Sequence, residues 1–158
     1  MSEVKPLSKI DKSILRELQR DGRTSFAELA RRVGLTTTPC MERVKRMERD
    51  GVIRGYTTLL DPSKLESALA VFVQIRLSRT SQNTFAKFKK AAMALDAVQE
   101  CYLVSGNFDY LIKARVADMN AYRILLGETL LSLPGVQEST SYVVMEELKE
   151  TLNVRVPD

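Results

Sequence analysis

The spacing of apolar residues in the first third of the chain predicts three short amphipathic helices in a row. Side chains suited to packing recur there every three or four positions, which is the period of one face of an α-helix. In each helix one face packs and the opposite face stays polar. The three packed stripes are Ile14, Leu15 and Leu18, then Phe26, Leu29, Ala30 and Val33, then Thr37, Cys40, Val44 and Met47.

Residues that favour helix ends lie between these stripes. Asp11 is expected to cap the first helix, and Ser25 with Glu28 three positions later forms a capping box for the second. Gly34 supplies a left-handed end for the second helix, and Thr36 can cap the third after a tight turn. Three helices joined in this way have the layout of a helix-turn-helix, which places its last helix in the major groove of DNA.

The outward face of the third helix is basic and admits two interpretations. The first 60 residues hold 13 Lys/Arg against 8 Asp/Glu, and the remainder holds 11 against 12, so the positive excess lies with the three helices. A charged helix face is often only a solvated face with ion pairs at helical spacing. The tight turn favours contact with double-stranded DNA instead, because it locks two helices at a steep angle. The predicted DNA-binding residues are Thr36, Thr37, Thr38, Met41, Glu42, Lys45, Arg46 and Arg49.

These residues would contact DNA in two ways. The threonines lie at the start of the helix, where its dipole favours phosphate groups, and they are close enough to reach base edges. Lys45, Arg46 and Arg49 would hold the DNA backbone or a guanine edge.

A change of pattern near residue 60 predicts a domain boundary. Residues 51–56 contain apolar residues flanked by glycines, which indicates a short strand that serves as a wing or as the start of a linker. Asp61-Pro62-Ser63 then interrupts the pattern. We expect a helix-turn-helix domain with its linker strand at 1–60, and an effector-binding and oligomerisation domain at 61–158.

The second domain switches between strand and helix periodicity in the order β-α-β-β-α-β. This order folds most simply as a ferredoxin-like antiparallel sheet with both helices on one face, so the fold class is α+β with a winged-helix-like N-terminal domain. The expected elements are strands at 69–77, 98–104, 110–116 and 136–145, a helix at 82–95, and a helix that starts at Asp118, buries Met119, Tyr122, Leu126 and Leu130, and ends at Pro134-Gly135.

The expected sheet has apolar side chains on both faces, although helices cover only one. Ala70 and Phe72 lie opposite the helix-facing row of the first strand, and Tyr142 and Val144 lie on the same open face. A contiguous apolar face most often means self-association, so we expect a homodimer. A dimer would also set two DNA-reading helices about one turn of DNA apart. Residues 147–157 are expected to add an edge strand.

Composition narrows the possible classes of function. The chain of 158 residues has two cysteines, both at positions expected in the core, and no histidine, so we expect neither a histidine-based catalytic arrangement nor a four-ligand zinc site. The longest apolar run has six residues, far too few for a membrane span or a signal peptide. The expected protein is cytoplasmic and not an enzyme, with no catalytic residue, metal or cofactor and no membrane contact.

A glycine turn between two predicted strands, Ser105-Gly106-Asn107-Phe108-Asp109-Tyr110, also has two interpretations. Glycine exposes backbone N–H groups that can hold a carboxylate, and Asp109 can accept hydrogen bonds from an α-ammonium group. The alternative is a plain hairpin turn in which Asp109 bonds its own backbone. The residues alone leave both interpretations open.

Four segments carry a specific resemblance that covers nearly the whole chain. They are GLTTTPCMERVKRMERDGVIRGY, QECYLVSGNFDYLIKARV, DMNAYRILLGETLLSLPGV and YVVMEELK. These segments resemble the Lrp/AsnC, or feast/famine, family of bacterial transcription regulators. The resemblance implies a DNA-binding helix-turn-helix, a ferredoxin-like ligand domain, and dimers that assemble into rings such as nucleoid-associated octamers. It also implies modulation by a small amino acid, leucine or another branched-chain residue, bound between dimers.

By position, the family's glycine-to-aspartate turn falls on Gly106 and Asp109, which favours the effector interpretation. The chain has Ser141 where the family often has threonine, and Thr37 where close relatives have proline. A rival interpretation is an amino-acid sensor similar to the ACT domains of regulated enzymes, acting through a protein partner; steep salt dependence of DNA affinity would separate the two. The effector-binding residues that the resemblance implies are Ser105, Gly106, Asn107, Phe108, Asp109, Tyr110, Ser139 and Ser141.

Overall fold

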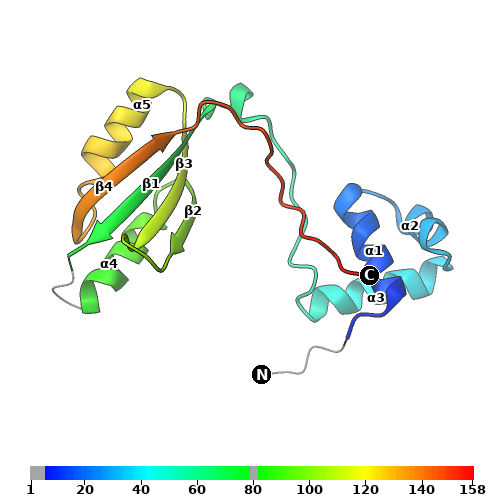
Figure 1. The fold of residues 1–158 in the computed structure, drawn as a ribbon. Helices are drawn as coiled ribbons and strands as arrows, with labels where there is room; N and C mark the ends of the chain where they lie inside the picture. The colour runs from blue at the N-terminus through cyan, green and yellow to red at the C-terminus, as the bar shows by residue number, and fades with distance from the viewer. Residues whose placement is uncertain (1–5, 79–81) are drawn as a thin grey trace. The chain divides into compact units, whose positions relative to one another are not determined.

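A computed structural model describes residues 6–78 and 82–158, which form two units (Figure 1). Contacts group the chain up to Leu59 with residues 150–158, and they group Leu60–Lys149 separately. The first unit contains three helices, α1 Lys9–Arg20, α2 Phe26–Val33 and α3 Thr37–Arg49. None of the described helices is long and apolar enough to cross a membrane.

The three helices of the first unit enclose a small core made by the predicted stripes. Two predicted members are exposed instead. Thr37 lies in the first turn of α3 beyond the packed residues, and Phe26, the first residue of α2, is 39% exposed. The fully buried apolar residues of this core are Ile14, Leu29, Ala30, Cys40, Val44 and Met47.

The helix ends agree with the sequence in part. Gly34 ends α2 in the left-handed conformation, at φ 71°, as predicted. Ser25 caps α2 by accepting a hydrogen bond of 3.2 Å from the backbone N–H of Glu28. The predicted capping box is only half formed, because the Glu28 carboxylate accepts from Arg31 and Arg32 instead. The prediction that Asp11 caps α1 is wrong: the helix begins earlier, with Ser8 at the cap and Asp11 three residues inside it. Asp11 completes a capping box by accepting a hydrogen bond of 3.0 Å from the Ser8 N–H.

The strand expected at 51–56 is not present in this described stretch. The chain turns there, and the N–H groups of Val52 and Ile53 both donate to the carbonyl of Met47, at 2.9 and 3.0 Å. Their side chains pack against the helical core. These residues therefore complete the C-terminal end of α3 instead of pairing with another strand.

The edge strand expected at 147–157 is also wrong for these described residues, which are not in a strand. Their last part contacts α1 instead. A guanidinium N–H of Arg16 donates to the carbonyl of Val156 at 3.3 Å, and the amide of Gln19 donates to the carbonyl of Val154 at 3.1 Å. Hydrogen bonds to helix side chains thus take the place of a strand ladder.

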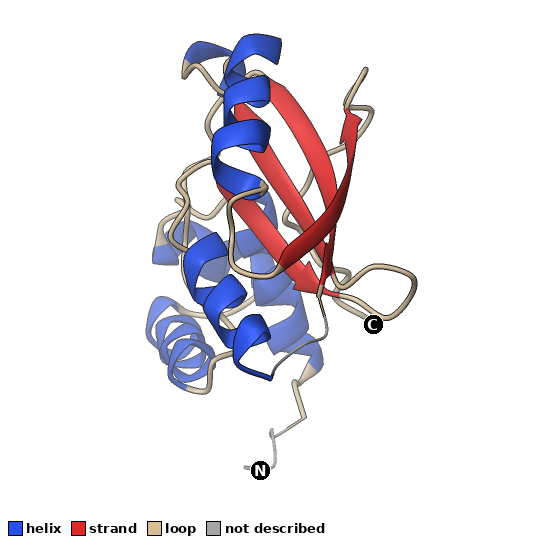
Figure 2. Ribbon diagram, turned by 90° about the vertical axis from the view of Figure 1, so that its left-hand side faces the viewer, coloured by secondary structure: helices blue, strands red, loops and turns tan. Residues whose placement is uncertain are grey.

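The second unit confirms the predicted β-α-β-β-α-β order. Its four strands are all antiparallel and lie in the spatial order β2-β3-β1-β4, which is the ferredoxin-like arrangement. Figure 2 shows the sheet edge-on, with the helices of this unit on one of its faces. The elements are η1 Pro62–Lys64, β1 Leu69–Leu77, α4 Gln82–Ala92, β2 Val98–Leu103, β3 Tyr110–Val116, α5 Met119–Ile124, η2 Leu125–Leu130 and β4 Val136–Val143.

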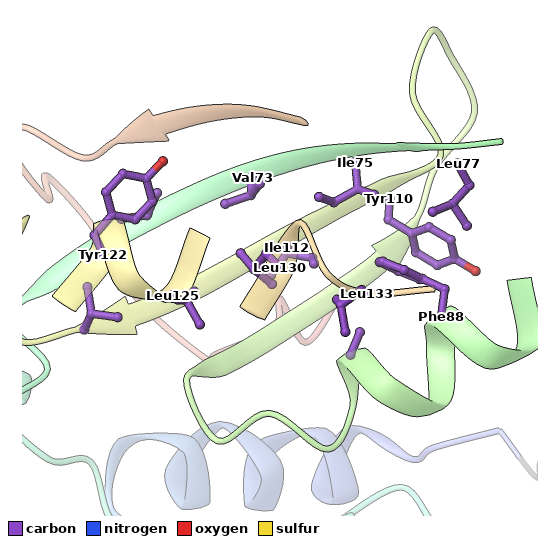
Figure 3. Packing of buried hydrophobic residues seen from close by; sticks show 14 residues of the cluster. Val73, Ile75, Leu77, Phe88, Tyr110, Ile112, Tyr122, Leu125, Leu130 and Leu133 are labelled. Atoms are coloured by element: carbon purple, nitrogen blue, oxygen red, sulfur yellow. The ribbon is translucent and has the colours of Figure 1, made fainter. Parts of the chain in front are cut away.

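Alternating residues of the central strand β1 form the floor of the core between sheet and helices. Val73 and Ile75 are fully buried there, as the period-two pattern predicted. From α4, Phe88 packs against Tyr110 of β3 with ring centroids 4.6 Å apart (Figure 3). The helices are thereby held against one face of the sheet.

The second helix of this unit departs from regular α-helical geometry. After α5 the chain continues as η2, a π-helical segment whose wider turn brings residues five apart into line, so Leu125 and Leu130 are both buried. The buried line therefore runs through Tyr122, Leu125 and Leu130. Met119, expected in this line, is 55% exposed, so that part of the prediction is wrong.

The open face of the sheet is less uniformly apolar than expected. Phe72 and Tyr142 lie side by side on it, with Tyr142 52% exposed. The strand register also places Lys113 and Arg115 on this face, opposite Phe72 and Ala70. Both cations are buried and paired, so apolar side chains and neutralised charges share the surface.

Candidate functional site

The helix α3 presents one exposed polar line to its surroundings. Thr38, Glu42, Lys45 and Arg49 are all exposed and are spaced so that they fall on the same helical face. The Arg49 side chain is 74% exposed, and its Nε lies 3.3 Å from Oδ1 of the neighbouring Asp50. Four of the predicted DNA-binding residues therefore share one surface.

The start of α3 carries exposed hydroxyl groups. Thr36 occupies the N-cap position with an extended backbone, but its side chain makes no capping hydrogen bond. Thr36, Thr37 and Thr38 are all exposed, whereas Met41 is half-buried. The threonine hydroxyls are consequently presented at the positive end of the helix dipole.

Arg46 lies in a different environment from the other predicted DNA-binding residues. Its Nη2 is 2.8 Å from Oδ1 of Asp11, and Nη1 of Arg43 is 2.9 Å from the same oxygen. Each arginine side chain is 32% exposed. Arg43 was not singled out from the sequence, because nothing in its local pattern shows that a carboxylate of α1 lies beside α3.

Asp11 is the buried centre of this cluster. Its Oδ2 accepts hydrogen bonds from the Ser8 N–H at 3.0 Å and from the Ser8 Oγ at 2.7 Å. Burial by itself would raise the pKa of Asp11, but the hydrogen bonds from Ser8 and Arg43 and the charge of Arg46 lower that pKa to about 2. The carboxylate is therefore ionised at neutral pH although the residue is only 2% exposed.

In the second unit, Asp109 links the β2–β3 connection to the central strand. Its Oδ2 accepts a hydrogen bond of 2.8 Å from the Leu77 N–H, and its own N–H donates to the carbonyl of Ile75 at 2.9 Å. Its carbonyl accepts from the Val104 N–H at 3.0 Å. Asp109 thus bonds across to β1. The plain-hairpin alternative required its carboxylate to bond the backbone of its own turn, and among the described residues it does not.

The turn exposes backbone donors beside this aspartate. Gly106 has a φ of 148°, in the region that favours glycine. Within the described part of the chain, the backbone N–H groups of Gly106, Asn107 and Phe108 have no hydrogen-bond acceptor. Three donors and one carboxylate are therefore gathered on the same short loop.

A hollow of about 220 Å³ lies at this loop. Arg76 forms one wall: its Nε and Nη2 donate to the Asn107 carbonyl at 3.0 and 2.6 Å, and its Nη1 is 3.0 Å from Oε2 of Glu138. The lining residues are Arg76, Leu77, Gly106, Asn107, Phe108, Asp109 and Gln137.

The remaining predicted effector residues do not line this hollow. Tyr110 is buried in the core, and Ser105 is exposed on the turn. Ser139 and Ser141 are half-buried on β4, opposite Ile75 and Val73. They therefore face the helix-covered side of the sheet.

Three lining residues were missed from the sequence: Arg76, Leu77 and Gln137. They meet at a register shift between β1 and β4, where Arg76 pairs with Glu138 but Leu77 pairs with Val136. This bulge leaves Gln137 without a partner in the ladder. No residue pattern in the sequence predicts this bulge.

The chain is similar to known proteins over almost its whole length. Residues 70–154 match the family described as the Lrp/AsnC ligand binding domain, and residues 7–54 match the family described as winged helix-turn-helix DNA-binding. The leucine-responsive regulatory proteins of Escherichia coli strain K12 and of Klebsiella pneumoniae are each 58% identical to it over 147 residues. Those alignments cover 93% of this chain and 90% of each relative.

Solved structures show the same similarity. A transcriptional regulator from Neisseria meningitidis, determined as a complex with L-Met, has a TM-score of 0.91 and 35% identity, covering 95% of this chain and 97% of that one. An AsnC family transcriptional regulator from Agrobacterium tumefaciens has a TM-score of 0.90 and 36% identity, covering 94% of this chain and 97% of that one.

The lowered pKa of Asp11 predicts a specific loss of stability in acid. A carboxyl group whose pKa is lower in the folded state stabilises that state above its unfolded pKa, and this contribution disappears as the pH falls towards the folded value. Lowering the pKa of Asp11 from its ordinary value of 3.8 to about 2 corresponds to about 2 kcal/mol of stability, lost between roughly pH 5 and pH 2.

We therefore expect Asp11→Asn to remove this part of the acid sensitivity, measured by urea unfolding followed by helix circular dichroism across that pH range. The exposed Asp21 provides the control, since Asp21→Asn should leave the acid-dependent loss in place. Identical pH profiles for Asp11→Asn and the wild type would contradict the assignment.

Proposed function

Because this chain belongs to the Lrp/AsnC family of DNA-binding transcription regulators, we propose that α3 reads double-stranded DNA while leucine or another branched-chain amino acid binds at the Gly106–Asp109 turn. The protein is a transcription regulator whose activity is modulated by a small amino acid. The observation that carries the proposal for DNA is the exposed polar line along α3.

The chemistry of that line suits the major groove. Lys45 and Arg49 supply positive charge for phosphate groups, and Lys45 makes no ion pair within the described chain. Thr38 and Glu42 lie between them and the start of the helix, with polar atoms that can reach base edges. The hydroxyl groups of Thr36 and Thr37 add donors where the helix dipole attracts phosphate.

The turn in the second unit supplies complementary partners for a free amino acid. The open N–H groups of Gly106, Asn107 and Phe108 suit an α-carboxylate. One oxygen of Asp109 is used by the Leu77 N–H, and the other is available to an α-ammonium group. We place the effector in this hollow, which Ser105, Tyr110, Ser139 and Ser141 do not line.

The size of the hollow suits a small ligand, and its mainly polar lining suits the charged groups of a free amino acid. Its volume of about 220 Å³ is below the range of roughly 300–1,000 Å³ that is typical of sites for drug-sized molecules. Phe108 contributes an aromatic side chain to its lining, whereas the Leu77 side chain is buried in the core. The names of the relatives point the same way, since one group is called leucine-responsive and one solved regulator holds L-Met.

We further propose that the chain forms a homodimer through the open face of the sheet and that dimers assemble into a higher oligomer such as an octamer. Phe72, Tyr102 and Tyr142 place aromatic surface on that face, and Tyr102 and Tyr142 are each about half exposed. A two-fold dimer would present two α3 helices to a pseudo-palindromic site.

On this proposal the protein works in the cytoplasm, associated with the nucleoid, as a regulator and not as an enzyme. An amino-acid sensor that acts through a protein partner is not favoured, because residues 7–54 match a DNA-binding family.

Two substitutions on α3 test the proposed DNA surface. Arg49→Ala is expected to weaken binding to all sequences alike and to reduce the slope of log affinity against log salt by roughly one, because a phosphate contact is lost. Thr38→Ala is expected to change sequence preference instead, since its hydroxyl lies nearer the bases. Fluorescence anisotropy on specific and scrambled duplexes measures both effects, and wild-type affinity for specific DNA in both variants would refute the assignment.

A substitution at Asp109 tests the effector site. Asp109→Asn keeps an acceptor for the Leu77 N–H but removes the charge that would hold the ligand ammonium, so it separates ligand binding from folding. Losing a charge-assisted hydrogen bond of about 1.5–3 kcal/mol corresponds to roughly 10- to 150-fold weaker binding. Asp109→Ala should be at least as defective.

Calorimetry with leucine, isoleucine, valine, methionine and alanine measures this loss, while DNA binding without effector should be unchanged. If the Asp109→Asn variant bound these amino acids with wild-type affinity, the effector site would have to lie elsewhere in the chain. No binding of any of these ligands to the wild type would overturn the branched-chain assignment.

The open sheet face is tested at Val144, whose N–H donates to the Ala70 carbonyl at 3.0 Å. Val144→Asp would place an unpaired charge in the proposed interface at a cost of several kcal/mol, so we expect monomers or insoluble protein. The neighbouring Met145 is 95% exposed in the chain, and Met145→Asp serves as the control. Light scattering that showed a soluble Val144→Asp protein of unchanged mass would rule out this face as the dimer interface.

A further inference from the structure

We infer that Asp11, a residue of α1, positions the side chains of Arg43 and Arg46 for DNA, so that part of the reading surface of α3 is set from another helix. This inference rests on the proposed role of α3 in DNA binding. It adds Asp11 as a positioning residue that itself need not contact DNA, and it adds Arg43 to the DNA-facing set.

The two oxygens of the Asp11 carboxylate have separate tasks. Oδ2 accepts from the N–H and the Oγ of Ser8, which closes the capping box of α1. Oδ1 accepts from Nη1 of Arg43 at 2.9 Å and is 2.8 Å from Nη2 of Arg46. One buried oxygen therefore orients two guanidinium groups that leave α3 on the same side.

Both arginines keep unbonded N–H donors after this contact. A guanidinium group carries five N–H donors, and Arg46 commits one nitrogen to Asp11 while Arg43 commits one nitrogen to Asp11 and Ser8. Each side chain keeps 32% of its surface exposed. Arg46 follows Lys45 of the exposed line, and the remaining donors of both arginines suit a phosphate or a guanine edge.

The charge balance distinguishes this role from a merely structural one. The ionised Asp11 offsets one of the two positive charges, so the cluster presents directed donors with one net positive charge. Removing the carboxylate charge would free both arginines and add one positive charge to the surface. A structural contact would affect only stability, whereas the positioning role predicts weaker discrimination together with stronger salt-dependent, non-specific binding.

The first test uses Asp11→Asn in the full-length protein at a temperature well below its unfolding transition. The probes are a duplex that the wild-type protein selects from a random library and a scrambled duplex of the same composition. We expect the ratio of the two affinities to fall about tenfold or more, which is the size of one lost directional contact. Binding to the scrambled duplex should tighten, and its salt slope should steepen by up to about one. An unchanged ratio and an unchanged slope would overturn the inference.

A double-mutant cycle shows whether Asp11 acts through the arginines. In an Arg46→Gln background, Asp11→Asn should have a smaller effect on the affinity ratio than in the wild type. Lys45→Gln removes the same charge from the adjacent position and serves as the control. In that background Asp11→Asn should change the affinity ratio as much as it does in the wild type. Full additivity in both backgrounds would contradict the inference.

Arg46→Lys covers the case in which Asp11→Asn does not fold. It keeps the charge but loses the planar fork, so the affinity ratio should fall while the salt slope stays the same; an unchanged ratio would overturn the inference. If Lys45→Gln and Arg49→Ala also left DNA binding intact, the proposed role of α3 would fail. If they weakened it while Asp11 and Arg46 variants changed stability alone, only the present inference would fail.

Discussion

A carboxylate buried between two helices must have all its hydrogen bonds made, and in this protein that requirement joins the start of α1 to the middle of α3. Asp11 is 2% exposed, and an unpaired charge at such a position would cost several kcal/mol. Ser8 and the two arginines of α3 provide the compensation. The capping of α1 and the direction of two side chains on α3 therefore depend on a single hydrogen-bond network, so a change at one helix affects the other.

A second aspartate has a comparable position in the sheet unit. Asp109 receives the Leu77 N–H, and its backbone bonds to Ile75 and Val104, so the β2–β3 connection is tied to the central strand. The same residue lines the hollow. A ligand held there would act on the end of β1, next to the bulge at Gln137, and not on an isolated loop. The physical basis for an effect of the ligand on the sheet is therefore present within this unit.

The open face of the sheet places a condition on any partner. Arg115 makes two hydrogen bonds to Glu147, of 3.0 and 2.6 Å, and Lys113 lies 3.8 Å from Glu100. Burying these groups further is tolerable only while the pairs stay intact, because a separated charge would be far more costly than the pair. A second copy of the same sheet would bring aromatic surface around Tyr142 and would leave the ion pairs in place. A purely apolar partner would supply no hydrogen-bonding groups to these charged side chains.

The sequence by itself determined the elements whose formation depends on local periodicity. Strand and helix stripes, the left-handed Gly34 and the order of the ferredoxin-like sheet all follow from which residues must be buried together along one element. Even the Gly106–Asp109 turn was visible, because glycine and aspartate mark it locally.

Only the tertiary structure decided the contacts between residues that are far apart in the chain. The pairing of Asp11 with Arg43 and Arg46, the meeting of Arg76, Leu77 and Gln137 at the hollow, and the docking of residues 154–158 on α1 leave no local pattern. Hydrophobic periodicity reports which face of an element is buried. It carries no information about which polar group on another element lies against that face, since that depends on how the elements pack.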